Sequence, residues 1–319
     1  MNDRLLFVGR RLLITIPVLL VLSLVVFLII HLVPGDPVRT MLGFRATPEN
    51  VATIRADLGL DRPLLTQYAS WLGNLVQGDL GEDYVSGSRL STLLSTALPV
   101  TLELTILAMG LATLIGVPLG VMAASRGRGW RSATEGFVIA GISIPDFWLG
   151  IMLVLLFTGP LKVLPPSGYE RISEDLSSNL RYMVLPVVTL AVAETAYIAR
   201  TTRGAVETAL IQPFVGYLRA KGVPERSVVF KHALRNAAVP IVTVIGIQFG
   251  VLLGGSIVIE YAFGLPGLGR LTVTAINQRN YVVVQGGVLV LAAMFIVVNV
   301  VVDLLVGVID PRVADGSAQ

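Results

Sequence analysis

Six runs of apolar residues, each long enough to cross a membrane, most strongly limit what this chain can fold into. A helix rises about 1.5 Å per residue, so about 20 apolar residues span the hydrocarbon core of a bilayer. The composition agrees, because 54% of residues are hydrophobic and 14% are charged, whereas roughly 25% are charged in a typical soluble domain. We therefore predict an all-α polytopic membrane protein. Its expected spans are Leu12–Leu32, Thr101–Ala124, Glu135–Thr158, Tyr182–Ala199, Ala238–Ile259 and Val284–Val308.

The Lys and Arg residues predict the orientation of these spans. Fourteen of the 24 fall in the cytoplasm when the N-terminus is placed there, and the short 125–134 loop has three arginines and no acidic residue. Because cytoplasmic loops carry an excess of Lys and Arg, both termini are expected in the cytoplasm. No small-residue cleavage site follows the first run, so it is predicted to be an uncleaved span and not a signal peptide.

The segment between the first two spans is too long for a simple connection. Its stretches Pro48–Leu60 and Thr66–Leu75 are amphipathic, with apolar residues to bury. We predict a small helical cap on the extracytoplasmic face. The expected organisation is residues 1–32, a cytoplasmic N-terminus and first span; 33–99, the cap; 100–309, a five-helix transmembrane core that includes a cytoplasmic loop at 203–236; and 310–319, a cytoplasmic tail.

Signatures of catalysis are missing from the sequence. It contains no G-x-x-x-x-G-K-[ST] loop for nucleotide phosphates, no H-E-x-x-H and no G-x-S-x-G. It has no cysteine and only two histidines, His31 and His232, which are too few for a thiolate or histidine metal site. We therefore expect no enzyme activity, no cofactor or metal bound by this chain, and no nucleic-acid partner.

A few polar residues interrupt the spans, and a charge at the centre of a membrane helix costs roughly 2.5–3.5 kcal/mol on insertion scales. Asp146 follows Pro145, which is expected to kink the third span. We interpret Asp146, Glu194, Tyr197 and Gln248 as candidates for a polar translocation pathway. The alternative is a buried packing pair or groups near the lipid headgroups, and the residues alone leave both open. The ionisable residues in or near the spans are Glu103, Asp146, Glu194 and Asp303.

Glycines at intervals of four mark helix faces that allow close packing. Gly246, Gly250 and Gly254 form such a row on the fifth span, and Gly116 and Gly120 repeat the spacing on the second. Small residues at this spacing let the backbones of membrane helices approach one another. We predict helix packing at these faces in preference to a role in gating.

The loop at 203–236 is predicted to form three short helices, Ala205–Ile211, Phe214–Lys221 and a third that opens at Val223–Pro224. Gly222 suits the position after a helix, and proline suits the first position of the next. Exposed apolar residues on a basic element usually mark an interface, so we favour docking of a soluble partner. The alternative is a basic loop that lies on anionic lipid. Its larger apolar residues are Phe214, Tyr217, Leu218 and Phe230.

Several short motifs extend over essentially the whole chain. They are Pro34-Gly35-Asp36-Pro37, Leu58-Gly59-Leu60-Asp61, Gly78-Asp79-Leu80-Gly81, Leu98-Pro99-x-Thr101-Leu102-Glu103, Arg219-Ala220-Lys221-Gly222, His232-Ala233-Leu234-Arg235-Asn236-Ala237, Pro266-Gly267-Leu268-Gly269, Val284-Gln285-Gly286-Gly287, Asp303 and Asp310-Pro311-Arg312. Each is weak alone, but together they resemble the membrane-spanning permease subunits of binding-protein-dependent ABC importers. The likeness is to the dipeptide, oligopeptide and nickel branch, and to the first permease of its pair.

The resemblance implies six transmembrane helices with a type I ABC importer permease architecture. In that family the cytoplasmic loop carries the EAA motif, whose coupling helix sits in a groove of the ATP-binding subunit. By resemblance, Phe214–Lys221 is this helix and Gly222 is the glycine of the motif. The chain departs from the pattern, because Gly216, Tyr217 and Leu218 occupy the Glu-Ala-Ala positions. The residues expected to couple to the ATPase are Phe214, Tyr217, Leu218, Arg219, Ala220, Lys221, Gly222, Glu225 and Arg226.

The resemblance also implies the partners and the mechanism. The expected partners are a sister permease in a heterodimer, two ATP-binding subunits or a fused pair, an extracytoplasmic substrate-binding protein, and the lipid bilayer of the cytoplasmic membrane. ATP and Mg²⁺ are bound by the ATPase subunits. Closure of those subunits moves the coupling helices and changes which side the central cavity opens to. The expected substrates are di- or oligopeptides, with nickel chelates or another small solute as the alternative.

Two other classes of protein are alternatives to this hypothesis. A self-contained secondary transporter would need an ion relay in mid-membrane and an inverted repeat, and no convincing repeat is present. An intramembrane enzyme would need a nucleophile paired with a base, and neither Ser nor His is suitably paired in the spans.

Overall fold

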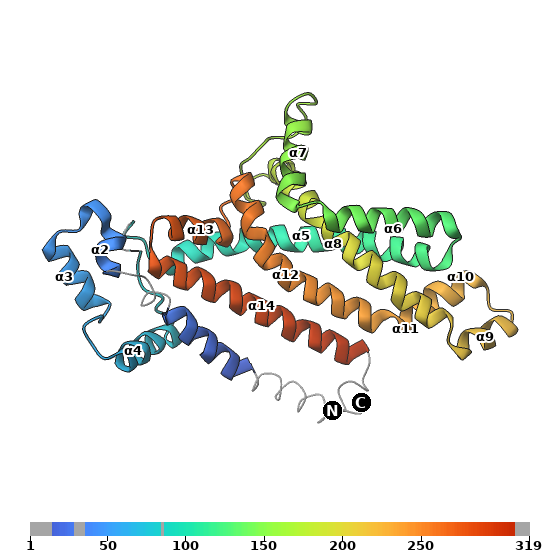
Figure 1. Cartoon of the computed structure of the whole chain (residues 1–319), viewed down its shortest axis with the longest axis horizontal. Helices are drawn as coiled ribbons and strands as arrows, with labels where there is room; N and C mark the ends of the chain where they lie inside the picture. The colour runs from blue at the N-terminus through green and yellow to red at the C-terminus, as the bar shows by residue number, and fades with distance from the viewer. Residues whose placement is uncertain (1–14, 29–35, 84–85, 310–319) are drawn as a thin grey trace. The chain divides into compact units, whose positions relative to one another are not determined.

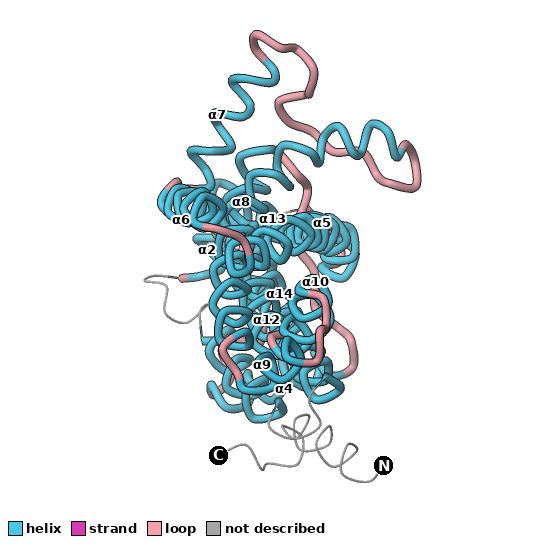
Figure 2. The backbone as a smooth tube through the Cα atoms, turned by 90° about the vertical axis from the view of Figure 1, so that its right-hand side faces the viewer, coloured by secondary structure: helices cyan, strands magenta, loops and turns pink. Residues whose placement is uncertain are grey.

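The computed structural model describes residues 15–28, 36–83 and 86–309. Within these ranges the regular structure is helical, apart from one isolated bridge between Glu82 and Arg89 (Figure 2). The expected all-α class is therefore confirmed. The predictions made for residues 1–14, 29–35 and 310–319 concern residues outside those that the structure describes.

Four helices are long and apolar enough to cross a membrane, and each contains or largely overlaps one predicted span (Figure 1). The two longest have 36 and 35 residues, or about 50 Å of helix each, so they extend well beyond a hydrocarbon core of about 30 Å. The helix Thr15–Leu28 is the described part of the first predicted span. The four long helices are α5 (Leu90–Ser125), α8 (Leu176–Leu210), α12 (Ala238–Phe263) and α14 (Tyr281–Ile309).

The third predicted span, Glu135–Thr158, is not one continuous helix. Instead, α6 (Arg128–Ser143) and α7 (Asp146–Thr158) meet at a bend of 99° (Figure 1). A residue that precedes proline is pushed out of the helical region, and Ile144 is accordingly extended, with ψ at 122°. Pro145 then occupies the N-cap of α7. The kink expected at Pro145 is therefore a complete break between two helices.

The chain divides into two compact units, and the first is built mainly from residues 102–265. Helix α8 is the main packing element of this unit, in contact with α6, α7 and α12. Glycines permit its close approach to α5. A Cβ atom on Gly120 would lie 2.6 Å from the carbonyl oxygen of Ala199, and one on Gly116 would lie 3.0 Å from Ile198. The glycine spacing on the second span thus marks a close helix contact.

The second unit is built mainly from residues 10–101 and 266–296. The two stretches of the predicted cap, Pro48–Leu60 and Thr66–Leu75, both contain helices in this unit. Thr47 caps the first of these, because its hydroxyl oxygen accepts a hydrogen bond from the backbone N–H of Asn50 at 3.2 Å. The shorter helices of this unit are α2 (Pro37–Leu42), the 3-10 turn η1 (Gly43–Arg45), α3 (Pro48–Asp57), α4 (Leu64–Val76) and α13 (Leu268–Asn277).

An apolar core holds the second unit together. Leu90, Leu268 and Val283 are buried in one cluster, and Leu58 and Leu80 of the cap pack against it. The cap residues are therefore part of a larger folded unit and not a separate module.

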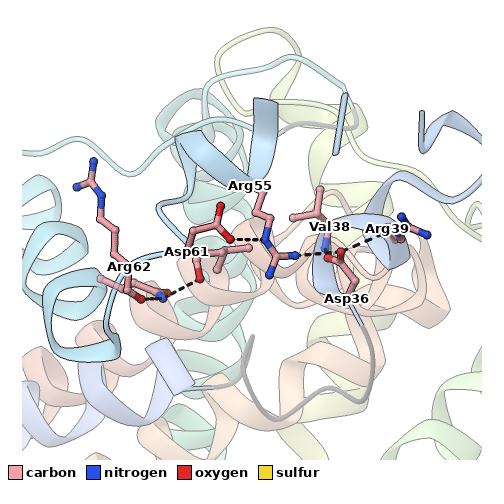
Figure 3. A network of polar contacts seen from close by, with 8 residues as sticks. Asp36, Val38, Arg39, Arg55, Asp61 and Arg62 are labelled. Carbon is pink, nitrogen blue, oxygen red and sulfur yellow. Dashed lines mark hydrogen bonds and ion pairs between the residues drawn. The ribbon is translucent and has the colours of Figure 1, made fainter. Parts of the chain in front are cut away.

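Charged residues fix the start of the cap. The guanidinium of Arg55 donates to Asp61 at 2.6 Å and to Asp36 at 3.1 Å (Figure 3). The hydrogen bond to Asp61 and the negative charges of Asp61 and Asp36 raise the pKa of Arg55 above its ordinary value. Because all three side chains are partly exposed, the pairs orient α2 and α3 and add little to stability.

Candidate functional site

The predicted coupling helix is present as α9 (Pro213–Ala220), one residue earlier than expected at each end. Pro213 takes the first helical position, where its missing N–H is not needed. At the other end Gly222 has φ +76°, and its N–H donates to the carbonyl oxygen of Arg219 at 2.9 Å. A left-handed glycine therefore ends the helix, as the sequence predicts.

The segments on either side of α9 differ from the three short helices predicted. The separate helix Ala205–Ile211 is wrong, because these residues continue α8 as far as Leu210. Val206 is completely buried and Ala209 nearly so, which keeps the buried face of α8 unbroken. Beyond Pro224, one helical stretch follows, made of α10 (Glu225–Ser227), the π segment η2 (Val228–Ala233) and α11 (Leu234–Asn236).

One apolar face anchors the loop to the membrane helices. Val215 of α9 and Val228 of η2 are completely buried. Val229 and Ala233 belong to a buried cluster that includes Val206 of α8. The position of α9 is consequently set by packing against helical residues. The sequence analysis did not single out Val215, although its place between Phe214 and Gly216 on an amphipathic helix was a usable signal.

On the opposite face of the loop, large apolar side chains are exposed. Tyr217 is 61% exposed, Phe230 is 58% exposed and Ile211 is 83% exposed. Phe214 and Leu218 are partly buried, and Phe214 lines a cleft of about 540 Å³ beside the end of α8. A folded basic element with exposed aromatic residues has the character of an interface.

A pair of oppositely charged residues closes the turn at Gly222. The guanidinium of Arg219 donates two hydrogen bonds to the carboxylate of Glu225, at 3.0 and 2.6 Å. This contact lowers the pKa of Glu225 and raises that of Arg219. The ammonium of Lys221 lies 4.5 Å from the centre of the Tyr217 ring, a cation–π distance. The remaining predicted coupling residues, Ala220, Lys221, Gly222 and Arg226, are exposed.

Three of the four predicted pathway residues come together in the first unit. The amide of Gln248 on α12 donates to the carboxylate of Glu194 on α8 at 2.9 Å, and both residues are buried. Asp146, at the start of α7, is near enough for its carboxylate to interact electrostatically with that of Glu194. Tyr197 lies one turn along α8 and is 38% exposed. Among the described residues, neither carboxylate has a basic partner.

The predicted glycine row on α12 packs unevenly. A side chain on Gly246 would collide with Val302 of α14, and Gly250 is buried. Gly254 is exposed, and a Cβ atom there would meet nothing within 4 Å among the described residues. Close packing inside the chain is therefore seen at the first of the three glycines.

Two further carboxylates, Glu103 and Glu260, are in surroundings that the sequence analysis did not predict. Glu103 accepts hydrogen bonds from Tyr169 and from Asn179, each at 2.8 Å, so it serves a structural contact. Glu260 is completely buried on α12 and accepts from the hydroxyl of Ser256 at 3.3 Å. It was missed because the fifth span was predicted to end at Ile259, although a single acid at the edge of an apolar run was a signal.

Two family descriptions match the chain. The binding-protein-dependent transport system inner membrane component matches residues 116–315, and the N-terminal part of such membrane components matches residues 4–105. The chain belongs to this family. It is therefore a multi-pass inner-membrane permease of an ABC importer that works with ATPase subunits. The prediction that the chain is a transport subunit and not an enzyme is confirmed by this assignment.

Individual relatives resemble the permease along almost its whole length. It is 41% identical over 299 residues to a putative peptide transport system permease protein of Brucella abortus, covering 93% of this chain and 95% of the relative. It is 37% identical to a dipeptide transport system permease protein of Alkalihalophilus pseudofirmus, with 95% and 98% covered. It is 40% identical to a glutathione transport system permease protein of Escherichia coli O6:H1, with 96% and 98% covered.

The permease also shares its fold with a solved transporter. The inward-facing MetNI methionine ABC transporter matches with a TM-score of 0.54 at 21% identity, covering 69% of the permease and 97% of that chain. This likeness establishes an ABC importer transmembrane fold.

Proposed function

We propose that this permease forms half of the translocation pathway of an ATP-driven importer of di- or oligopeptides. The observation that carries the substrate class is the set of relatives named for peptide, dipeptide and glutathione transport, which are 37–41% identical over 93–96% of the chain. Glutathione is itself a tripeptide, so the three names share one substrate chemistry. An extracytoplasmic binding protein delivers the peptide to the outer mouth of the pathway.

The proposed assembly contains this permease, a sister permease, two ATP-binding subunits or a fused pair, and the binding protein. The first predicted span and the bent pair α6–α7 join the four long helices to make six membrane crossings in a type I architecture, which the shared fold supports. Both termini lie in the cytoplasm in this arrangement. The cap at 33–99 then faces the binding protein, and the loop at 203–236 faces the ATPase.

The coupling role of the loop rests on its two contrasting faces. Buried Val215 and Val228 fix α9 to the end of the helix bundle, whereas Tyr217 and Phe230 are more than half exposed. A rigid anchor with an exposed aromatic face suits a helix that transmits rigid-body movement from a docked subunit. Arg219 and Glu225 hold the turn in one geometry, so movement of α9 reaches α8 and α12 without being absorbed by the loop.

The proposed pathway lining is the group formed by Asp146, Glu194 and Gln248, with the hydroxyl of Tyr197 nearby on α8. Carboxylates taken out of water without a basic partner favour positively charged groups. A peptide with a free amino terminus carries an ammonium group at neutral pH. The chemistry of these residues therefore matches the cationic end of a peptide in transit.

Uptake by the reconstituted complex tests the proposal. Labelled dipeptide is expected to enter liposomes only when the ATPase hydrolyses ATP, and unlabelled di- and tripeptides are expected to compete. Uptake that persists with a partner ATPase that binds but does not hydrolyse ATP would indicate a secondary transporter. Competition by nickel chelates and not by peptides would show that the substrate is a nickel chelate, and the proposed importer role would still hold.

A further inference from the structure

A basic cleft lies where α5 ends and α6 begins. It has a volume of about 540 Å³ and is lined by Arg126, Arg128, Arg131 and Ser132. The two acidic residues that complete its wall are Glu135 and Glu207. The coupling and pathway residues described above do not line it. A preference for cytoplasmic arginines accounts for basic residues in this loop, but it does not account for their arrangement around a cleft.

The charges around this cleft do not balance. Glu135 accepts from Arg203 at 2.5 Å and from Arg131 at 3.3 Å, and Glu207 lies 3.9 Å from Arg203 and 4.0 Å from Arg131. Arg131 and Arg203 are thus committed to the two carboxylates. Within the described residues, Arg126 and Arg128 have no ion pair.

The cleft directly follows an apolar membrane segment. Helix α5 is apolar enough to cross a bilayer, its apolar residues continue to Ala124, and the arginines at 126, 128 and 131 follow at once. The guanidinium of Arg126 lies 5.4 Å from the centre of the Trp130 ring, and that ring is 43% exposed. Tryptophan is enriched at membrane–water interfaces because its ring is apolar and its N–H is polar.

We propose that this cleft binds the phosphate headgroup of an anionic phospholipid. Guanidinium groups recognise phosphate oxygens through paired hydrogen bonds, and Arg126 and Arg128 have donors to spare. The hydroxyl of Ser132 adds a further donor. Basic pockets beside membrane helices are a known type of headgroup site. Bound lipid at this point stabilises the turn between α5 and α6.

Native mass spectrometry of the complete purified importer tests this proposal, with phosphatidylglycerol and phosphatidylcholine as probes. The wild-type complex is expected to retain phosphatidylglycerol preferentially. The double substitution Arg126→Gln and Arg128→Gln is expected to weaken that retention roughly tenfold or more and to leave phosphatidylcholine retention unchanged. The matched control is Lys162→Gln with Arg171→Gln, which removes two exposed basic residues outside both the cleft and the 203–236 loop and is expected to have no effect.

Two results would overturn the proposal. One is equal retention of phosphatidylglycerol by the wild type and the arginine double variant in correctly assembled complexes. The other is displacement of the lipid by millimolar inorganic phosphate, which would identify free phosphate as the ligand of the same groups. Replacement of both arginines by lysine, which keeps the charge but loses the paired geometry, is expected to restore part of the preference.

Discussion

Glu194 and Glu225 are each held by one side chain, yet their surroundings are opposite. Glu194 is 6% exposed and its partner is the neutral amide of Gln248. Glu225 has a side chain that is 58% exposed, and its partner is the guanidinium of Arg219. The buried carboxylate loses hydration without gaining a counter-charge, a costly arrangement that transport can explain. The exposed pair contributes little to stability but defines the shape of a turn.

The comparison predicts that substitutions in the loop impair binding of the ATPase, whereas substitutions around Glu194 impair peptide uptake. The largest effect is expected from Tyr217→Asp combined with Phe230→Asp, which places charges in the exposed aromatic face of the loop. Aromatic residues that become buried at the centre of an interface contribute about 2 kcal/mol or more each to binding. Binding of the ATPase is therefore expected to fall by roughly 30-fold for each substitution. Co-purification of the ATPase subunits measures the effect.

A matched control for this experiment is Phe44→Asp, because Phe44 is a fully exposed aromatic residue of the cap. It is expected to leave ATPase binding unchanged. Normal co-purification of the ATPase with the double variant would show that this face does not bind the ATPase.

Glu194→Gln is expected to have the next largest effect, on peptide uptake and not on binding of the ATPase. The substitution keeps the size of the side chain but removes the charge that would meet a peptide ammonium group. A hydrogen bond to a charged group is worth about 1.5–3 kcal/mol, so peptide uptake is expected to fall roughly tenfold or more. Co-purification of the ATPase is expected to stay normal. Wild-type uptake by this variant would place Glu194 outside the pathway.

The long helices and their interruptions could be predicted because their signals are local. Apolar runs predict spans, Pro145 predicts an interruption of the third span, although as a kink and not a complete break, and Gly222 predicts a helix end. Pairings between distant residues could not be predicted, because no local pattern specifies them. Asn280 contacts Asp83, and Tyr169 contacts Glu103, across large sequence separations. Such contacts depend on how the helices pack.

The end of α8 and the pathway group illustrate the same limit. The polar residues after Ala199 suggested that the span had ended, whereas the buried residues Val206 and Ala209 belong to a helix that continues to Leu210. Helical spacing placed Glu194 and Tyr197 on neighbouring turns, but only packing decides that Glu194 meets Gln248 while Tyr197 remains partly exposed.

Two glycines on one helix sharpen the contrast between interior and surface. Gly120→Ala on α5 would place a methyl group 2.6 Å from the backbone oxygen of Ala199, and overpacking of this kind costs about 1–3 kcal/mol. Gly110→Ala on the same helix meets nothing within 4 Å in the described structure. A lower melting temperature is expected for the first variant alone. Equal melting temperatures for both variants would show that α5 and α8 are not closely packed at Gly120.

The smallest effect is expected at the exposed ion pair, and it depends on pH. The pKa of Glu225 in the folded loop is below its ordinary value of 4.5. The pair therefore stabilises the folded loop above that value and loses its effect as pH falls through the lower folded pKa. Glu225→Gln is expected to lower the melting temperature slightly near pH 7. That difference should vanish in acid as the pH falls well below the ordinary pKa of 4.5, and a difference that persists there would point to another cause.

The absence of native cysteine permits a direct test of the docking claim. A single Tyr217→Cys substitution is labelled with a short thiol-reactive photocrosslinker that does not require a lysine, so that the neighbouring Lys221 does not capture it, and is irradiated in the assembled importer. We predict a covalent product with an ATPase subunit, and none from Phe44→Cys. No product from Tyr217→Cys in an active, intact complex would contradict the assignment of α9 as the coupling helix.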